Sequence, residues 1–272
     1  MKKKNNKVSK KTNKQVVVVL SIYQKKFTED EKISLKQLRK QLYKKYEICL
    51  YTHKDMLKYI KKEPLLQGYK IKIFPKKFFT YQGFNKLLKS QKFYTSFKDY
   101  KYMLVIHTDC LIFKNDLSYF CEKNYDYIGA PIFNDYSSEK LIYHFVGNGG
   151  LSLRKISTAI KVLESRKNPI KFLKWSIPHF LKLPKKLFNK FILKNEYPIS
   201  SLLSRNEDIF WSCEAKKFYP QFKVAPFKEA CKFSIENGRE KCMEINSGEL
   251  PFGCHAFHHH KDFWRKHSNI KM

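Results

Sequence analysis

The chain has 272 residues, of which 43% are hydrophobic and 16% aromatic, so it can bury one sizeable core. Its formal net charge of +31 at pH 7 would ordinarily indicate a nucleic acid or an anionic membrane as partner. Only six of the 55 basic residues are arginine, so the planar guanidinium group that reads bases bidentately is scarce. We therefore expect no specific nucleic-acid partner.

The cysteines and the apolar runs indicate the compartment. The seven cysteines form an odd set without a Cys-x-x-Cys pair, which argues against a disulfide framework and a zinc ribbon. The run Val16–Leu20 is too short for a signal-peptide core, and no segment reaches the ~18 apolar residues of a membrane-spanning helix. We expect a cytoplasmic protein, soluble or peripheral at the inner face of the cell membrane.

One globular domain is predicted over residues 15–260, with a basic disordered tail at 1–14 and a C-terminal tail at 261–272. An insertion at about 168–195 is rich in lysine and aromatic residues and has no acidic residue. That composition fits contact with an anionic membrane surface. An ordinary surface insertion fits about equally well, because its three prolines break any long amphipathic helix.

Strand-like and helix-like patterns alternate along the chain, which is typical of an α/β fold with a mainly parallel sheet. The first half predicts four strands, at Val16–Ile22, Glu47–Tyr51, Tyr69–Phe74 and Tyr102–Asp109. Thr28 and Glu31 have the spacing of a capping box and predict the start of a helix after the first strand. A second amphipathic helix is predicted over Phe84–Phe97 and leads into the fourth strand.

After the fourth strand we expect a short helix at Asn115–Asn124 and then a strand that begins at Tyr125 and ends in a turn, because Pro131 forbids further pairing. A glycine cluster follows in Gly147-Asn-Gly-Gly150. These glycines let the backbone take a positive φ or approach a ligand closely. A tight hairpin turn is the alternative, since the pattern is neither a dinucleotide fingerprint nor a P-loop.

Three polar clusters are candidates for chemistry. The fourth strand ends on an isolated carboxylate, Asp109, and open α/β sheets bind ligands at the carboxyl ends of their strands. If Asp109 holds a metal ion, the protein handles phosphates. Glu207 and Asp208 fit the first turn of a helix for dipole reasons alone, or one of them is a general base. Gly253 beside His255 indicates a loop that lies close to another group.

Together the motifs resemble a family of largely uncharacterised bacterial and fungal glycosyltransferase-like proteins of the GT-A type. The likeness runs from about residue 15 to about residue 257. It is carried by Asn85-Lys-Leu-Leu88 with Phe93-Tyr94, His107-Thr-Asp109, Tyr125-Asp-Tyr-Ile-Gly-Ala-Pro131, Gly147-Asn-Gly-Gly-Leu-Ser-Leu-Arg154, Asn206-Glu-Asp208 and Pro251-Phe-Gly-Cys-His255.

The resemblance implies a GT-A-like fold and transfer of a sugar from a nucleotide-diphospho-sugar donor, with the diphosphate bridged by Mn²⁺ or Mg²⁺. The acceptor would be a glycan or a lipid-linked glycan in bacterial surface polysaccharide or glycolipid synthesis. GT-A enzymes usually hold the metal on Asp-x-Asp, whereas here the first position is His107. Imidazole also suits such metals, so Asp109, His107 and His255 are the implied ligands.

The resemblance also assigns the remaining site residues. Thr108 joins His107 and Asp109 in binding the donor, Gly149 and Gly150 let the backbone lie against the sugar, and Arg154 or a neighbouring lysine assists the leaving diphosphate. If the anomeric centre inverts, Asp208 or, less favoured, Glu207 is the base; retention of configuration would need neither.

A hypothesis of another class is a non-catalytic GT-A-fold protein or a basic nucleic-acid-binding protein. The histidine at position 107 would then mark decay of the metal motif. The presence of Asp109, Asp208 and His255 argues against decay.

Overall fold

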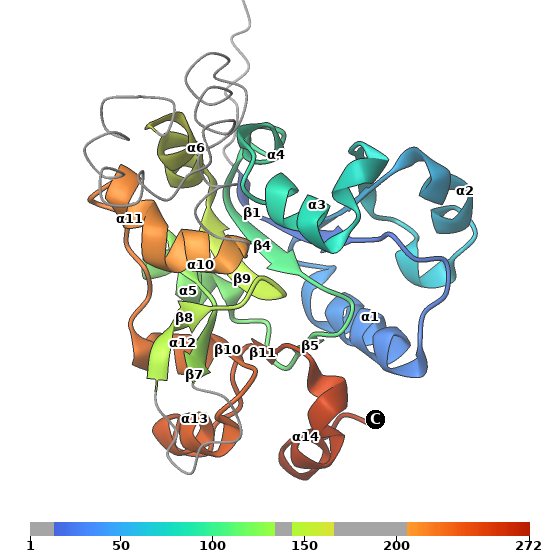
Figure 1. Ribbon diagram of the computed structural model, residues 1–272. Helices are drawn as coiled ribbons and strands as arrows, with labels where there is room; N and C mark the ends of the chain where they lie inside the picture. The colour runs from blue at the N-terminus through green and yellow to red at the C-terminus, as the bar shows by residue number, and fades with distance from the viewer. Residues whose placement is uncertain (1–13, 134–142, 166–205) are drawn as a thin grey trace, which may run out of the picture.

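The computed structural model describes residues 14–133, 143–165 and 206–272 (Figure 1). Its strands are β1 (Lys14–Ser21), β2 (Glu47–Thr52), β3 (Lys70–Ile73), β4 (Tyr100–Ile106), β5 (Leu111–Ile112), β6 (Tyr127–Ile128), β7 (Ala130–Phe133), β8 (Tyr143–Gly147), β9 (Leu151–Lys155), β10 (Ser234–Ile235) and β11 (Gly253–Cys254). Its α-helices are α1 (Glu29–Leu42), α2 (Leu57–Ile60), α3 (Tyr81–Leu87), α4 (Gln91–Thr95), α5 (Leu117–Glu122), α6 (Ile156–Ser165), α10 (Glu207–Ile209), α11 (Ala215–Phe218), α12 (Phe227–Phe233), α13 (Arg239–Ile245) and α14 (Lys261–His267). Short 3₁₀ helices are η1 (Lys54–Met56), η2 (Pro64–Leu66), η3 (Lys76–Phe78) and η5 (Phe257–His260), and the π-helix η4 (Phe210–Glu214) joins α10 to α11.

The central sheet has six strands in the order β3-β2-β1-β4-β9-β6. The first four run parallel, and β9 runs antiparallel to both of its neighbours. Two small sheets, β10-β11-β5 and β7-β8, lie beside it. The predicted fold class is confirmed: an α/β fold with a mixed, mainly parallel sheet flanked by helices, as expected of a GT-A-like domain.

Strand β1 shows how both faces of the sheet are covered. Val16, Val18 and Leu20 belong to one hydrophobic cluster, whereas Val17 and Val19 belong to a second. Successive side chains of a strand point to opposite faces, so a fully apolar strand must be buried on both sides. The continuous valine run therefore predicts a central strand, which is where β1 lies.

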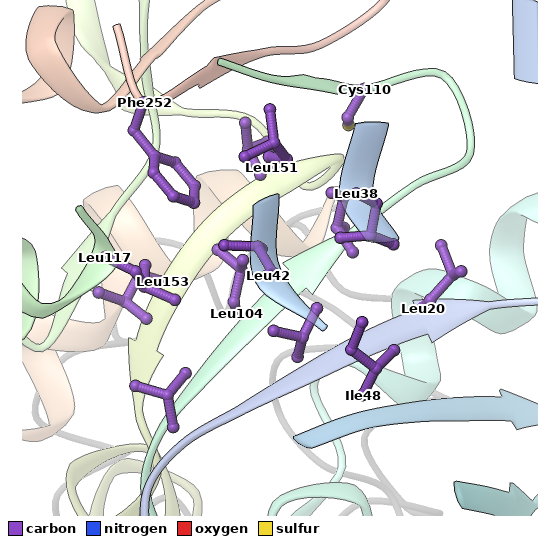
Figure 2. Packing of buried hydrophobic residues seen from close by; sticks show 14 of the residues in the cluster. Leu20, Leu38, Leu42, Ile48, Leu104, Cys110, Leu117, Leu151, Leu153 and Phe252 are labelled. Carbon is purple, nitrogen blue, oxygen red and sulfur yellow. The ribbon is translucent and has the colours of Figure 1, made fainter. Parts of the chain in front are cut away.

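Helix α1 covers the first face. Its predicted capping box is present: the Thr28 side chain accepts from the backbone of Glu31, and the Glu31 side chain accepts from the backbone of Thr28. Figure 2 shows Leu38 and Leu42 of this helix among side chains of the sheet such as Leu104. The cap sets where α1 begins, and burial of its apolar stripe fixes it on the sheet.

Helices α3, α4, α6 and α11 cover the second face. The single helix predicted over Phe84–Phe97 is wrong, because the chain forms α3 and α4 with a break between them. Ser90 causes the break: its hydroxyl accepts from the backbone of Phe93 and caps α4. The apolar residues at helical spacing are nevertheless buried, since both short helices face the same cluster.

The prediction that Pro131 ends pairing is also wrong. Pro131 lies inside β7, opposite Val146 of β8. A two-stranded sheet leaves each strand an open edge, where the missing N–H of proline removes no ladder bond. The hairpin alternative for the glycine cluster is excluded as well, since β8 pairs with β7 whereas β9 pairs with β4 and β6.

The end of the chain differs from the predicted tail at 261–272. It carries α14, and Trp264 of this helix is buried in a third hydrophobic cluster with Leu111 and Phe257. The predicted basic tail, except for residue 14, and the insertion at 168–195 lie outside the described residues. Within the described ranges, no helix has the length and apolar character to cross a membrane.

Candidate active site

The triplet His107-Thr-Asp109 forms a loop at the carboxyl end of β4, which stops at Ile106. The backbone N–H of His107 donates to the carbonyl of Gly150 at 2.9 Å, so the glycine cluster lies directly beside the triplet. The triplet lines a cavity of about 600 Å³ together with residues that follow β1, begin α1 and begin α3. The position agrees with the rule that open α/β sheets bind ligands at this edge.

His255 reaches the same place through a small sheet. Strand β11 pairs antiparallel with β5, with Cys254 opposite Leu111. Position 255 therefore comes next to the residues that precede β5, and the Nε2 atom of His255 lies 3.4 Å from Oδ1 of Asp109. The two residues are far apart in sequence, and this pairing is what brings them together.

His107, Asp109 and His255 each offer one ligand atom, and these atoms lie within 4.8 Å of one another. Within the described part of the chain, His107 Nε2 and Asp109 Oδ1 are buried and make no hydrogen bond. Buried polar atoms normally have partners, so the unpaired Nε2 of His107, beside an Asp109 Oδ1 whose nearest partner is His255 Nε2 at 3.4 Å, indicates room for a ligand. Two imidazoles and a carboxylate suit a divalent ion such as Mn²⁺, and these three residues would hold it.

The pKa values at this cluster are strongly displaced. Burial lowers the pKa of His107 to about 4, and the charge of His255 adds to that effect. Burial alone would also lower the pKa of His255, but its contacts with Asp109 and Glu236 raise it to about 10. Burial would raise the pKa of Asp109, yet the contact with His255 and the charge of His107 place it well below its ordinary value. Strong, opposed shifts of this kind gather at functional sites.

Glu236 and Asn148 belong to the cluster but were not among the predicted site residues. Glu236 Oε1 lies 3.1 Å from Nδ1 of His255, which leaves Nε2 facing Asp109. Asn148 donates from its side chain to Glu236 and accepts from the backbone N–H of Gly150 at 2.7 Å. The asparagine within the glycine cluster was a detectable signal, because asparagine tolerates the left-handed conformation that it adopts at φ 80°. Nothing in the sequence around Glu236 marks it.

Neighbouring side chains occupy the space that a Cβ atom would need at Gly149 and at Gly150. A Cβ atom at 149 would overlap the carboxylate of Glu207, and one at 150 would overlap the ring of His255. The sequence predicted that both glycines lie against the sugar. In the structure they leave room for the side chains of Glu207 and His255 to pack against the backbone.

Arg154 and Glu207 form a buried ion pair. Their side chains are 1% and 2% exposed, and Arg154 Nη1 lies 2.6 Å from Glu207 Oε2. Arg154 also donates to Ser152 and Tyr94. Burial raises the pKa of Glu207, and the charge of Arg154 opposes that rise. Neither side chain lines the cavity, so Arg154 is not placed to touch a diphosphate there.

Asp208 has a different setting from its neighbour Glu207. It is partly exposed, and its Oδ2 atom accepts from the backbone N–H of Asn148 at 3.1 Å. Its Oδ1 atom accepts from the N–H of Ile209 in the first turn of the helix. Asp208 is thereby tied through Asn148 to Glu236, which contacts His255.

Thr108 lines the cavity, but its hydroxyl is already engaged. It donates to Glu31 Oε1 at 2.6 Å, and the other carboxylate oxygen of Glu31 caps α1. The capping residue thus also positions the loop after β4. Sequence spacing identified the cap but not this second contact.

The charged groups of the cavity are acidic. Among the described residues that line it, Asp30, Glu31 and Asp109 are charged, and none is Lys or Arg. Asp30 is paired with Lys261 at 2.7 Å. In a chain with 55 basic residues, this absence sets the cavity apart from the surface around it.

The solved structures that resemble this chain in shape include two glycosyltransferases. A glycosyltransferase involved in the glycosylation of the major capsid of PBCV-1 is 11% identical, with a TM-score of 0.42, over 89% of this chain and 92% of that one. Core-mannan synthase A (CmsA/Ktr4) from Aspergillus fumigatus, in its Mn/GDP form, is 14% identical with a TM-score of 0.35. That overlap covers 46% of this chain and less than half, 44%, of the synthase. Both likenesses are distant, and neither assigns an activity to this chain.

Comparison with curated protein sequences gives no significant match. A family model described as "Protein of unknown function (DUF5672)" matches residues 68–255, which is more than half of the chain. The matched range includes the triplet after β4, the glycine cluster, Glu207, Asp208 and His255. The chain belongs to this family, DUF5672.

Proposed function

We propose that this protein is a glycosyltransferase that moves a sugar from a nucleotide-diphospho-sugar donor to a glycan or lipid-linked acceptor, with inversion, in bacterial surface polysaccharide or glycolipid synthesis. One observation carries the proposal. Three ligand atoms, from His107, Asp109 and His255, converge within 4.8 Å of one another beside a cavity of about 600 Å³, and the buried Nε2 of His107 lacks a hydrogen-bond partner in the described chain.

The charge of the cavity supports a metal-dependent donor site. Of the three carboxylates that line the cavity, Asp30 is paired with Lys261 and Asp109 with His255. No Lys or Arg is among the described lining residues, so the lining by itself does not neutralise the charge of a nucleoside diphosphate. A divalent ion held by the three ligands would neutralise it, because such an ion binds carboxylates and phosphates together. When bound, Mn²⁺ or Mg²⁺ would neutralise the charge that develops on the leaving diphosphate.

The chain's own residues divide the remaining work. Asp208 is partly exposed and is the candidate base for the acceptor hydroxyl, since a general base needs a free approach to the proton. Glu207 is the weaker candidate, because Arg154 holds its carboxylate in the interior. Glu236 fixes the ring of His255, as carboxylates commonly do behind metal-bound histidines.

A donor screen tests the proposal. Common nucleotide sugars are added to the full chain with Mn²⁺, and thermal unfolding is recorded, because a ligand stabilises by RT ln(1 + [L]/Kd). We expect one donor class to raise the Tm and to release nucleoside diphosphate on incubation. Asp109→Ala should abolish both effects, whereas Asp262→Ala, which removes a carboxylate that is 98% exposed on α14, should change neither.

Two results would overturn the glycosyltransferase proposal. One is the absence of donor binding and hydrolysis with any divalent metal. The other is tight binding of single-stranded nucleic acid with a steep salt dependence, which would instead favour a basic nucleic-acid-binding protein.

The peripheral membrane location also belongs to the proposal. The lysine-rich, aromatic segment at 168–195 supports it by composition alone, since the segment lies outside the described residues. We expect co-sedimentation of the full chain with anionic vesicles but not with neutral ones. Equal behaviour with both vesicle types would remove the membrane contact.

A further inference from the structure

Tyr81 is the most exposed large apolar side chain of the described residues, at 71%. It lies at the start of α3 and lines the cavity together with Thr80 and Phe84. A single exposed tyrosine is ordinary on a protein surface. What distinguishes Tyr81 is its position at a cavity and the contacts that hold it there.

Two hydrogen bonds fix Tyr81. Its hydroxyl donates to Oδ1 of Asn206 at 2.8 Å, and its carbonyl accepts from the side chain of Asn85 at 2.9 Å. The same Asn85 accepts from the backbone N–H of Glu207 at 2.7 Å. The Tyr81 ring is therefore exposed, yet the residue is held by its hydroxyl and its carbonyl to the segment that carries Asp208, the candidate base.

Tyr81 connects the cavity to the segment that carries Asp208. Tyr81 lines the same cavity as His107 and Asp109, where the donor diphosphate is proposed to bind. Its hydroxyl is bonded to Asn206, two residues before Asp208. The acceptor hydroxyl must approach the base and the donor at once, and Tyr81 is the lining residue whose hydroxyl is bonded to the segment that carries Asp208.

We propose that Tyr81 is an acceptor-binding residue that stacks on the apolar face of a carbohydrate ring; this rests on the function proposed above. A tyrosine offers a large flat apolar surface with a polar end, and here the polar end is already held by Asn206. The C–H face of a pyranose pairs with such a surface, while its hydroxyl groups remain free for hydrogen bonds. The inference names the acceptor as a carbohydrate at its reacting end.

Ligand-observed NMR tests the stacking role with simple sugars in place of the full acceptor. The probes are methyl glycosides of common hexoses, titrated into the full chain with UDP or GDP and Mn²⁺. We expect at least one glycoside to bind the wild type, with a Kd about 3- to 10-fold higher in Tyr81→Ala, the range of an aromatic stacking contact. Tyr81→Phe keeps the ring and should lie closer to the wild type than Tyr81→Ala does.

Nucleotide binding is measured in the same samples. In Tyr81→Ala it should fall by less than glycoside binding does. Ile73→Ala, which removes another exposed apolar side chain outside the cavity lining, should leave both affinities unchanged. Weaker nucleotide binding with unaltered glycoside binding would overturn the acceptor assignment, and so would a wild type that binds no glycoside. Failure of the wild type to bind any nucleotide would instead overturn the proposed function, so the two failures are distinguishable.

Discussion

Two clusters of charged side chains lie beside Gly149 and Gly150, and they differ in burial and in how closely their charges are paired. The buried pair, Arg154 and Glu207, is 1% and 2% exposed and closed by a bidentate contact. In the second cluster, which comprises His107, Asp109, His255 and Glu236, His107 and Asp109 line the cavity. The Asp109 and His255 side chains are 31% and 18% exposed. The first cluster pairs opposite charges at 2.6 and 2.8 Å. In the second, His107 Nε2 makes no hydrogen bond in the described chain, and Asp109 Oδ1 has only the longer contact of 3.4 Å with His255 Nε2.

The difference teaches how to separate a structural charge from a functional one. A buried ion pair is tolerated only when its partners satisfy each other, so it has little left for a ligand. A cluster that holds unsatisfied ligand atoms beside a cavity loses stability that a bound ion would recover. The predictions that follow test this distinction.

The largest expected effect comes from breaking the buried pair. Glu207→Ala leaves the Arg154 guanidinium buried without its partner and should lower the free energy of unfolding by about 3–5 kcal/mol, measured by urea denaturation. The double variant Arg154→Met/Glu207→Leu should recover most of that loss, because it removes both charges. A stable Glu207→Ala protein that has lost only its activity would move Glu207 into the catalytic site.

Glu236→Gln should weaken metal binding strongly and change stability little. Loss of the carboxylate behind His255 should weaken Mn²⁺ binding about 10- to 100-fold, followed by electron paramagnetic resonance of the free ion. Its effect on the free energy of unfolding should be about 1 kcal/mol, since one hydrogen-bond acceptor remains on the side chain. Glu244→Gln on α13, whose carboxylate is 70% exposed, is the matched control. Unaltered Mn²⁺ affinity in Glu236→Gln would separate Glu236 from the metal site.

Substitutions at the adjacent residues Gly149 and Gly150 disturb the two clusters separately. Gly149→Ala and Gly150→Ala should each cost about 1–3 kcal/mol, because each added Cβ meets a packed side chain. Only Gly150→Ala should also weaken Mn²⁺ binding, since it displaces His255, whereas Gly149→Ala displaces Glu207. If the two variants lose metal affinity equally, the clusters are not independent.

The smallest effect is expected at Thr108. Thr108→Val removes the hydroxyl that donates to Glu31 and should cost about 0.5–1.5 kcal/mol of unfolding free energy. Donor affinity should change little, because the structure uses this hydroxyl to hold the loop. Thr108→Ser keeps the hydroxyl that donates to Glu31 and serves as the control. A large loss of donor affinity in Thr108→Val, at unchanged stability, would restore the donor-binding role that the sequence predicted.

Much of the frame could be predicted because its signals are local. The valine run of β1, the capping box of α1 and the carboxylate that follows β4 depend only on neighbouring residues. The break between α3 and α4 was missed because an apolar stripe at helical spacing outweighed the capping potential of Ser90. Pairing of Pro131 was missed because edge strands cannot be distinguished from central ones in a single short segment.

The sequence by itself determined the α/β alternation and the position of Asp109 at a strand end, since periodicity and turn chemistry act over a few residues. The roles expected of His107, Asp208 and His255 followed from the resemblance of the motifs. Only the tertiary structure decided which of these groups meet. The pairing of β11 with β5 sets His255 beside Asp109, and burial turns Arg154 toward Glu207 and away from the cavity. Such contacts join residues far apart in the chain, and their partners depend on packing that no local pattern records.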